Sequence, residues 1–131
     1  RQCNVVKCPA SECSCGVAGS DLIISQNFLT EIHSNRDQGI RTFEGLVRRS
    51  DCRYLVFVEN NYPKTKQLMN DLALHLYNQG LVTKPARAQT SSIRPNIVQP
   101  EVLTKHLYAD VNGLRARKNV TYHYITIEIA R

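Results

Sequence analysis

Residues 53–80 read RYLVFVENNYPKTKQLMNDLALHLYNQG, and this stretch decides the fold class. Its first part, Arg53–Glu59, holds a continuous apolar run of strand length, which is typical of a strand buried on both faces. Pro63 suits the first position of a helix, because its missing N–H would have no partner there. Gly80 is a good helix terminator, and apolar residues recur at helical spacing at Leu68, Met69, Leu72 and Leu76. The stretch therefore predicts a strand followed by a helix over residues 63–79.

The sequence before this unit predicts one more helix. Ser20 suits an N-cap, and apolar residues recur near helical spacing at Leu22, Ile23, Phe28, Leu29 and Ile32. A polar run over residues 34–39 is expected to end this helix. Residues 40–47 fit no element clearly.

The sequence after Gly80 is richer in loops. Residues 84–93 predict a further strand, and prolines favour loops around it, at Pro85, Pro95 and Pro100. A short helix is expected to begin at Pro100 and to carry Leu103 and Leu107. Alternation of isoleucines with polar residues over 120–130 predicts a half-buried strand.

These elements predict an α+β fold, in which two or three helices pack on a mixed sheet behind a short cysteine-rich N-terminal segment. A length of 131 residues is that of a single domain. We therefore expect a cysteine-rich anchor over residues 1–19 and one α+β domain over residues 20–131. From Arg53 onward the order of elements, and that order alone, is similar to small β-α-β-α-β-β folds that bind nucleic acid.

Four cysteines gather near the N-terminus, at Cys3, Cys8, Cys13 and Cys15. In an oxidising compartment they would form disulfides, and in a reducing compartment they would hold Zn²⁺ in a tetrahedral site. Unlinked thiols are a third alternative, because the spacing only partly resembles that of known zinc folds. Under the zinc alternative, Cys52 is an ordinary buried thiol. Whether the protein is intracellular or secreted depends on which state holds.

The chain is basic, with 17 lysines and arginines against 11 acidic residues and a net charge of +6. This balance predicts an anionic partner, and nucleic acid first. The predicted nucleic-acid-binding residues gather at the entry to the first strand, the start of the main helix and the approach to the last strand: Arg48, Arg49, Arg53, Lys64, Lys66, Arg115, Arg117 and Lys118. Three tyrosines are available for base stacking: Tyr108, Tyr122 and Tyr124. The alternative is a merely solvated surface.

No catalytic motif in the sequence is specific enough to name a reaction. His106 and His123, with Lys105 or Lys118 nearby, would suit acid–base cleavage of RNA. However, His123 alternates in register with isoleucines, which favours a packed histidine. No apolar run approaches the length of about 20 residues that spans a bilayer.

We expect a non-enzymatic domain that contacts nucleic acid, RNA in particular, through its arginine and lysine surface, within a larger assembly that includes other protein subunits. The alternative is a secreted, disulfide-stapled protein of toxin or effector type that binds a host or cell-surface target. The cysteines favour that alternative, as does Asn119, which begins an N-glycosylation acceptor sequence. A structural coat or shell subunit is a further alternative that the composition leaves open.

Overall fold

The structure, a computed structural model, describes residues 19–94, Glu101, Lys105 and residues 119–131. The described residues divide into two units: residues 19–91 with 122–131 belong to the first, and residues 92–94, Glu101, Lys105 and residues 119–121 belong to the second. Apart from Gly19, Glu101 and Lys105, the predicted cysteine anchor and the predicted helix from Pro100 lie outside the described residues. The described elements in chain order are β1 (Leu22–Gln26), α1 (Leu29–Ile32), a 3₁₀ turn η1 (His33–Asn35), α2 (Arg36–Arg49), β2 (Tyr54–Asn60), α3 (Pro63–Asn78), β3 (Gln89–Ile93) and β4 (Val120–Glu128).

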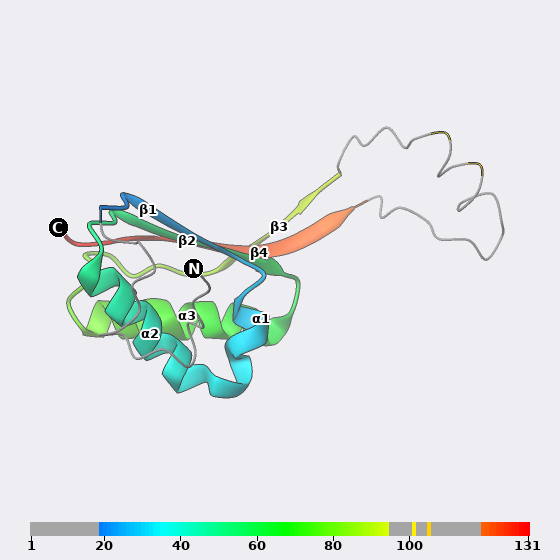
Figure 1. Ribbon diagram of the computed structural model, residues 1–131. Helices are drawn as coiled ribbons and strands as arrows, with labels where there is room; N and C mark the ends of the chain where they lie inside the picture. The colour runs from blue at the N-terminus through cyan, green and yellow to red at the C-terminus, as the bar shows by residue number, and fades with distance from the viewer. Residues whose placement is uncertain (1–18, 95–100, 102–104, 106–118) are drawn as a thin grey trace. The chain divides into compact units, whose positions relative to one another are not determined.

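The strands form one mixed sheet in the order β1-β2-β4-β3, so the predicted α+β fold is confirmed. β1 runs parallel to β2, with Leu22 opposite Tyr54. β2 runs antiparallel to β4, with Phe57 opposite Ile125. Parallel neighbours need a crossover connection, and α2 lies in the segment that supplies it. Figure 1 shows α1, α2 and α3 on one side of the sheet.

The core lies between the sheet and these helices. On β2 and β4, Leu55, Phe57, Ile125 and Ile127 are all at most 1% exposed and point toward the helices. Their neighbours Tyr54, Val56, Tyr124 and Thr126 point the other way and are half-buried or exposed. The prediction of a β2 strand buried on both faces is therefore wrong. Among the described residues, only one face of the sheet is covered by helices.

The prediction of a helix that begins at Ser20 is also wrong, because the first half of that segment forms strand β1. The apolar run Leu22–Ile24 pairs with β2. This pairing outweighs the helical spacing of the apolar residues, which is only approximate. The strand ends at Gln26, and the next residue, Asn27, has a φ of 51°, in the left-handed region that asparagine tolerates. Only the short helix α1 follows before the chain turns through η1 into α2.

Residues 34–39 do not end a helix there, because α2 begins at Arg36 and continues through residues 40–47, which the sequence left unassigned. Its buried face holds Phe43, which contacts Phe28 and Phe57 edge-on at ring-centroid distances of 6.0 and 4.9 Å. These three rings join the β1–α1 turn, α2 and β2 into one core.

The predicted strand–helix unit over residues 53–80 is confirmed as β2 and α3, and the predicted last strand is confirmed as β4. The strand predicted over residues 84–93 is shorter than expected. It begins only at Gln89, while Val82 forms an isolated antiparallel bridge with Ile129. Residues 83–88 between these two pairings leave the edge of β4, and Pro85, which lacks an N–H, lies among them.

Candidate nucleic-acid interface

The helix-free face of the sheet carries apolar and aromatic side chains, and we call it the open face. On β1, Leu22 is 47% exposed and Ile24 is 64% exposed. The open face also includes Tyr54, Val56 and Val58 of β2 and Tyr122 and Tyr124 of β4. Figure 1 shows the helices against the opposite face of the sheet. An exposed sheet face with apolar side chains and several aromatic rings is a surface on which unpaired bases can stack.

Tyr122 and Tyr124 form a pair on this face. Side chains two residues apart on a strand point to the same side, and the two ring centroids lie 5.9 Å apart with their planes tilted by 44°. Both residues are only half-buried. The pair therefore leaves ring surface open to a further planar group.

A groove of about 440 Å³ borders the open face at Tyr124, and we call it the β4 groove. It lies where residues 83–88 depart from β4. Two exposed cationic side chains line it, Lys84 and Arg87, together with the exposed carboxylate of Glu128. The remaining lining residues are Pro85, Ala86, Gln89, Tyr124, Ile125 and Thr126. The groove therefore combines an aromatic ring with two positive charges and one negative charge.

The main chain of Thr126 faces this groove. Ile129 N–H donates to Arg53 C=O on the β2 side (2.9 Å), and Ala130 N–H donates to Leu81 C=O on the opposite side (2.8 Å). In an antiparallel ladder the main-chain groups of successive residues alternate between the two sides. The N–H and C=O of Thr126 therefore point away from β2, and within the described stretches no backbone hydrogen bond joins them to residues 83–88. Thr126 offers one donor and one acceptor to a molecule in the groove.

The predicted basic residues fall into separate groups. Arg48, Arg49 and Arg53 lie where α2 ends and β2 begins, whereas Lys64 and Lys66 lie in the first turn of α3, beyond the other end of β2. A seven-residue strand between the two groups spans roughly 20 Å. Arg115, Arg117, Lys118 and Tyr108 lie outside the described residues.

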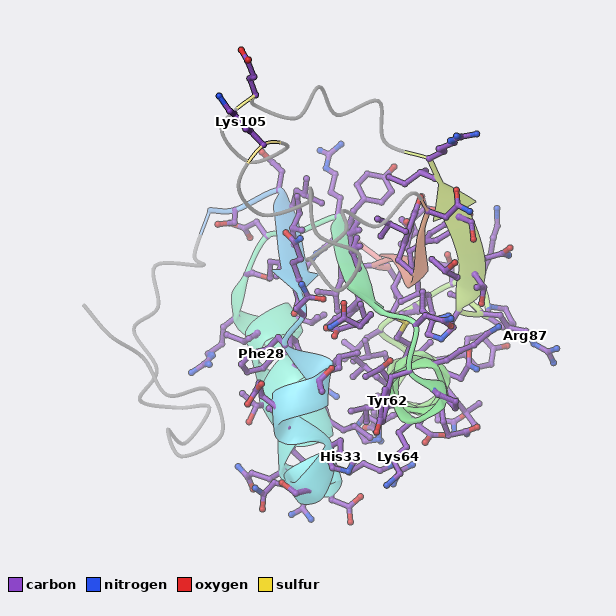
Figure 2. All side chains as sticks on the ribbon, turned by 90° about the vertical axis from the view of Figure 1, so that its right-hand side faces the viewer. Phe28, His33, Tyr62, Lys64, Arg87 and Lys105 are labelled. Carbon is purple, nitrogen blue, oxygen red and sulfur yellow. The ribbon has the colours of Figure 1, made fainter. Side chains whose placement is uncertain are left out.

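Two members of the first group already have partners. Arg48 forms an ion pair with Glu44 at 2.8 Å, one helical turn away, and Arg49 Nε donates to Gly45 C=O at 3.1 Å. The sequence prediction missed Lys84 and Arg87. They are far from Tyr124 in the sequence, and only the path of residues 83–88 brings them to the groove that Tyr124 lines. Figure 2 shows Arg87 on the β3 side and Lys64 beside the start of α3.

Of the predicted cysteine cluster and glycosylation site, together with Cys52, the structure describes only Cys52 and the sequon residues from Asn119 onward. Cys3, Cys8, Cys13 and Cys15 lie outside the described residues, so the disulfide and zinc alternatives stay predictions. Cys52 is a buried free thiol, and its Sγ accepts a hydrogen bond from Ser50 Oγ at 3.0 Å. Among the residues that the structure describes, no group of three metal-ligating side chains comes together. Asn119 is exposed immediately before β4.

His123 is packed inside the first unit. It is 4% exposed, and its Nδ1 lies 2.9 Å from Thr90 Oγ1. Lys66 Nζ donates to the same Thr90 oxygen at 2.9 Å. Burial, and secondly the positive charge of Lys66, lower the pKa of His123 below its ordinary value of 6.5. This environment favours the neutral form of a packed, hydrogen-bonded histidine, and packing is what the alternation in the sequence predicts. His106 lies outside the described residues.

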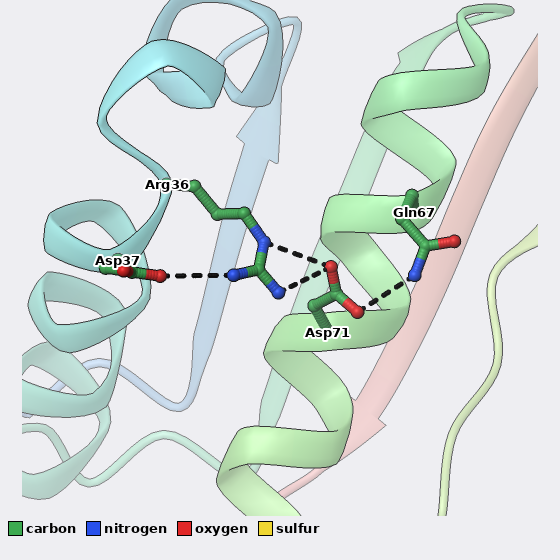
Figure 3. Close-up of polar contacts among 4 residues, drawn as sticks. All are labelled: Arg36, Asp37, Gln67 and Asp71. Atoms are coloured by element: carbon green, nitrogen blue, oxygen red, sulfur yellow. Dashed lines mark hydrogen bonds and ion pairs between the residues drawn. The ribbon is translucent and has the colours of Figure 1, made fainter.

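A second groove, of about 360 Å³, lies between α2 and α3 and is lined by Arg36, Asp71 and His75 among others. Two arginines, Arg36 and Arg41, and two aspartates, Asp37 and Asp71, line it, so their formal charges cancel. Arg36 pairs with Asp71 at 2.7 Å and with Asp37 at 3.1 Å, and Gln67 donates to the other oxygen of Asp71 (Figure 3). On α3, His75 Nε2 lies 2.6 Å from Glu44 Oε2. These contacts tie α2 to α3, and they leave the β4 groove better suited to an anionic ligand.

Comparison with known proteins finds no match: no protein-family model, no curated protein and no solved structure is significantly similar to this chain. In the described part of the chain, no helix has the length and apolar character needed to cross a membrane.

Proposed function

We propose that this protein binds single-stranded nucleic acid, RNA in particular, with its bases on the open face and a phosphate at the β4 groove. The observation that carries the proposal is the position of Tyr124. Its ring belongs to the Tyr122–Tyr124 pair and also lines the groove that holds Lys84 and Arg87. Aromatic rings beside cations are the combination that single-strand-binding surfaces use.

The shape of the surface supports a single strand over a duplex. The open face presents tyrosine rings on a sheet, and such rings are reached only by bases that are unstacked and unpaired. Readers of duplex DNA commonly insert a projecting helix or ribbon into a groove, whereas α2 and α3 pack their buried faces against this sheet. The net charge of +6 adds a general attraction for the strand.

The proposal is tested by fluorescence anisotropy of a labelled RNA decamer of mixed sequence with the full chain. Tyr122→Ala and Tyr124→Ala are each expected to weaken binding by about 5- to 150-fold, because a base–aromatic stack contributes about 1–3 kcal/mol. Tyr77→Ala is the matched control, since Tyr77 is 42% exposed on α3. Equal loss in all three variants, or no binding by the parent protein, would contradict the proposal.

A salt titration separates the phosphate contacts from stacking. Binding should weaken linearly on a logarithmic scale as salt rises, with a slope near 0.7 for each phosphate neutralised on a single strand. Because the proposal places one phosphate at the β4 groove, Lys84→Ala and Arg87→Ala should each lower the slope, and the double variant should lower it by about that amount. Arg41→Ala, at an exposed position on α2, should leave it unchanged. A slope that Lys84→Ala and Arg87→Ala do not change would remove the β4 groove from the interface.

A further inference from the structure

We infer that the β4 groove holds a single unpaired nucleobase, with the main chain of Thr126 hydrogen-bonded to the edge that a base uses in Watson–Crick pairing. This inference rests on the proposed function and names the part of the nucleic acid that the groove takes. It assigns recognition to peptide groups, in addition to the stacking and phosphate contacts already proposed.

The chemistry of Thr126 fits a base edge. Its N–H and C=O point to the same side of β4, into a groove that Thr126 itself lines. Each of the four RNA bases carries an acceptor next to a donor on its pairing edge, so each offers a complement to this pair of groups. A base whose edge is already paired in a duplex has no groups free for Thr126. The contact therefore selects for an unpaired base rather than for one particular base.

An added peptide strand also uses main-chain groups at the edge of a sheet. Here the chain itself closes both ends of the free edge. Val82 pairs with Ile129 at one end, and β3 begins at Gln89 at the other, where Thr90 bonds to His123. Strands in proteins mostly run for about five residues or more, and an edge this short offers few bonds to one. A planar base needs only the gap at Thr126.

The charges and the ring around this gap favour a nucleotide over an uncharged planar molecule. Lys84 and Arg87 are exposed on the wall formed by residues 83–88, and Tyr124 lies on the β4 side. Glu128 lines the same groove, and its negative charge would repel a phosphate. The three charged side chains together still carry a net charge of one positive unit. Phosphate, ring and edge of one nucleotide would thus each meet a matching group.

The direct test leaves the protein unchanged and alters the RNA. A uridine decamer is compared with a decamer of 3-methyluridine, in which a methyl group replaces the donor on the pairing edge and leaves the phosphates and the ring face in place. We expect about 10-fold weaker binding of the methylated decamer, which corresponds to the loss of one to two hydrogen bonds. The backbone amide resonance of Thr126 should shift with the uridine decamer and much less with the methylated one. Equal affinities and an unshifted Thr126 resonance would overturn the inference.

A main-chain variant supplies a second test. Thr126→Pro removes the N–H that points away from β2, so it deletes no bond of the β2–β4 ladder. Thr126→Val is the control, because it keeps both main-chain groups. We expect Thr126→Pro to lose the preference for uridine over 3-methyluridine and Thr126→Val to retain it. If the proline variant does not fold, the comparison of the two RNAs decides alone.

The outcomes keep this inference separate from the proposed function. Binding that depends on Tyr122 and Tyr124 but ignores the base edge would overturn the inference and leave the proposed function standing. Absence of binding to the mixed-sequence decamer as well as to the uridine decamers would overturn both. A Thr126 shift caused by an unstructured acidic peptide in place of RNA would also overturn the inference.

Discussion

Glu59 caps the first turn of α1 from a neighbouring strand, because its Oε1 accepts hydrogen bonds from the backbone N–H groups of Phe28 at 2.7 Å and Leu29 at 2.8 Å. The carboxylate is 1% exposed and lies at the carboxyl end of β2, next to the end of its parallel neighbour β1. Helix starts leave N–H groups without partners, and the N-cap residue Phe28 has no side chain that could accept from them. One acidic side chain thus satisfies the turn between β1 and α1.

We predict that Glu59→Ala lowers the free energy of unfolding by about 2–4 kcal/mol, because it leaves two buried N–H groups without an acceptor. Glu59→Gln should cost less, since the amide oxygen still accepts. Urea denaturation of both variants gives the numbers, and Glu31→Gln, at an exposed position of α1, is the control. The capping role is refuted if Glu59→Ala is as stable as Glu31→Gln.

The same contact explains which parts of the fold the sequence could predict. β2, α3 and β4 follow from local patterns: an apolar run, a helical stripe after Pro63, and strict alternation. β1 does not, because Leu22–Ile24 is short and becomes a strand through its partner more than 30 residues later. The start of α1 depends on a carboxylate 30 residues away from Leu29, which no local pattern contains.

The candidate site was less predictable than the fold. The sequence predicts Tyr122 and Tyr124 on the same side of a strand, because alternate residues of a strand share a face, and β4 confirms this placement. Lys84 and Arg87 were missed, since their meeting with Tyr124 depends on where residues 83–88 leave β4. The proposed role of Thr126 belongs to its main-chain N–H and C=O. Every residue except proline has both groups, so the amino-acid type at position 126 could not have indicated this role.

Stability should depend on pH through His123. Burial and then Lys66 lower its pKa, so the unfolded chain binds this proton more readily than the folded protein does. Stability from His123 is therefore fully present above its ordinary value of 6.5 and is lost as the pH falls toward the lowered value. Two charged groups face this histidine. Lys66 of α3 reaches it through the Thr90 hydroxyl, and Glu59 is its register partner on β2.

We expect wild-type protein to lose more free energy of unfolding than His123→Gln between pH 7 and pH 5.5. The difference between the two proteins cancels the histidines that they share, and chemical denaturation at each pH measures it. If stability instead rose on acidification in a manner that His123→Gln abolished, attraction by Glu59 would outweigh burial and Lys66.

Arg131 holds the end of α2 and should contribute measurably to stability. Its Nη2 donates to Val47 C=O at 3.0 Å and Ser50 C=O at 2.6 Å, and its Nε donates to Cys52 C=O at 3.0 Å. Carbonyls at the end of a helix lack partners within it, and a cation there also interacts favourably with the helix dipole. We predict that Arg131→Ala costs about 1–3 kcal/mol and that Arg131→Lys recovers only part of it, because an ammonium lacks the planar fork of the guanidinium. Thermal or urea unfolding tests this, with Arg87→Ala as an exposed arginine control. Arg131→Ala with the stability of Arg87→Ala would show that these bonds contribute nothing net.

Glu128 provides a test of the interface in which affinity should rise. Its exposed carboxylate lines the β4 groove together with Lys84 and Arg87, and no salt bridge joins it to another described residue. A carboxylate about 8 Å from a phosphate repels it by about 0.5 kcal/mol in water, so Glu128→Gln should tighten RNA binding about 2-fold at low salt. The gain should shrink as salt screens the charges.

Anisotropy titrations at two salt concentrations measure both effects, and Glu31→Gln, which removes the same charge on the helix side, controls for the change in net charge. An equal gain in both variants would mean that only net charge matters and that the strand does not pass along the groove. Weaker binding by Glu128→Gln alone would mean that the carboxylate accepts a hydrogen bond from the RNA, which places a donor of the nucleotide at that end of the groove.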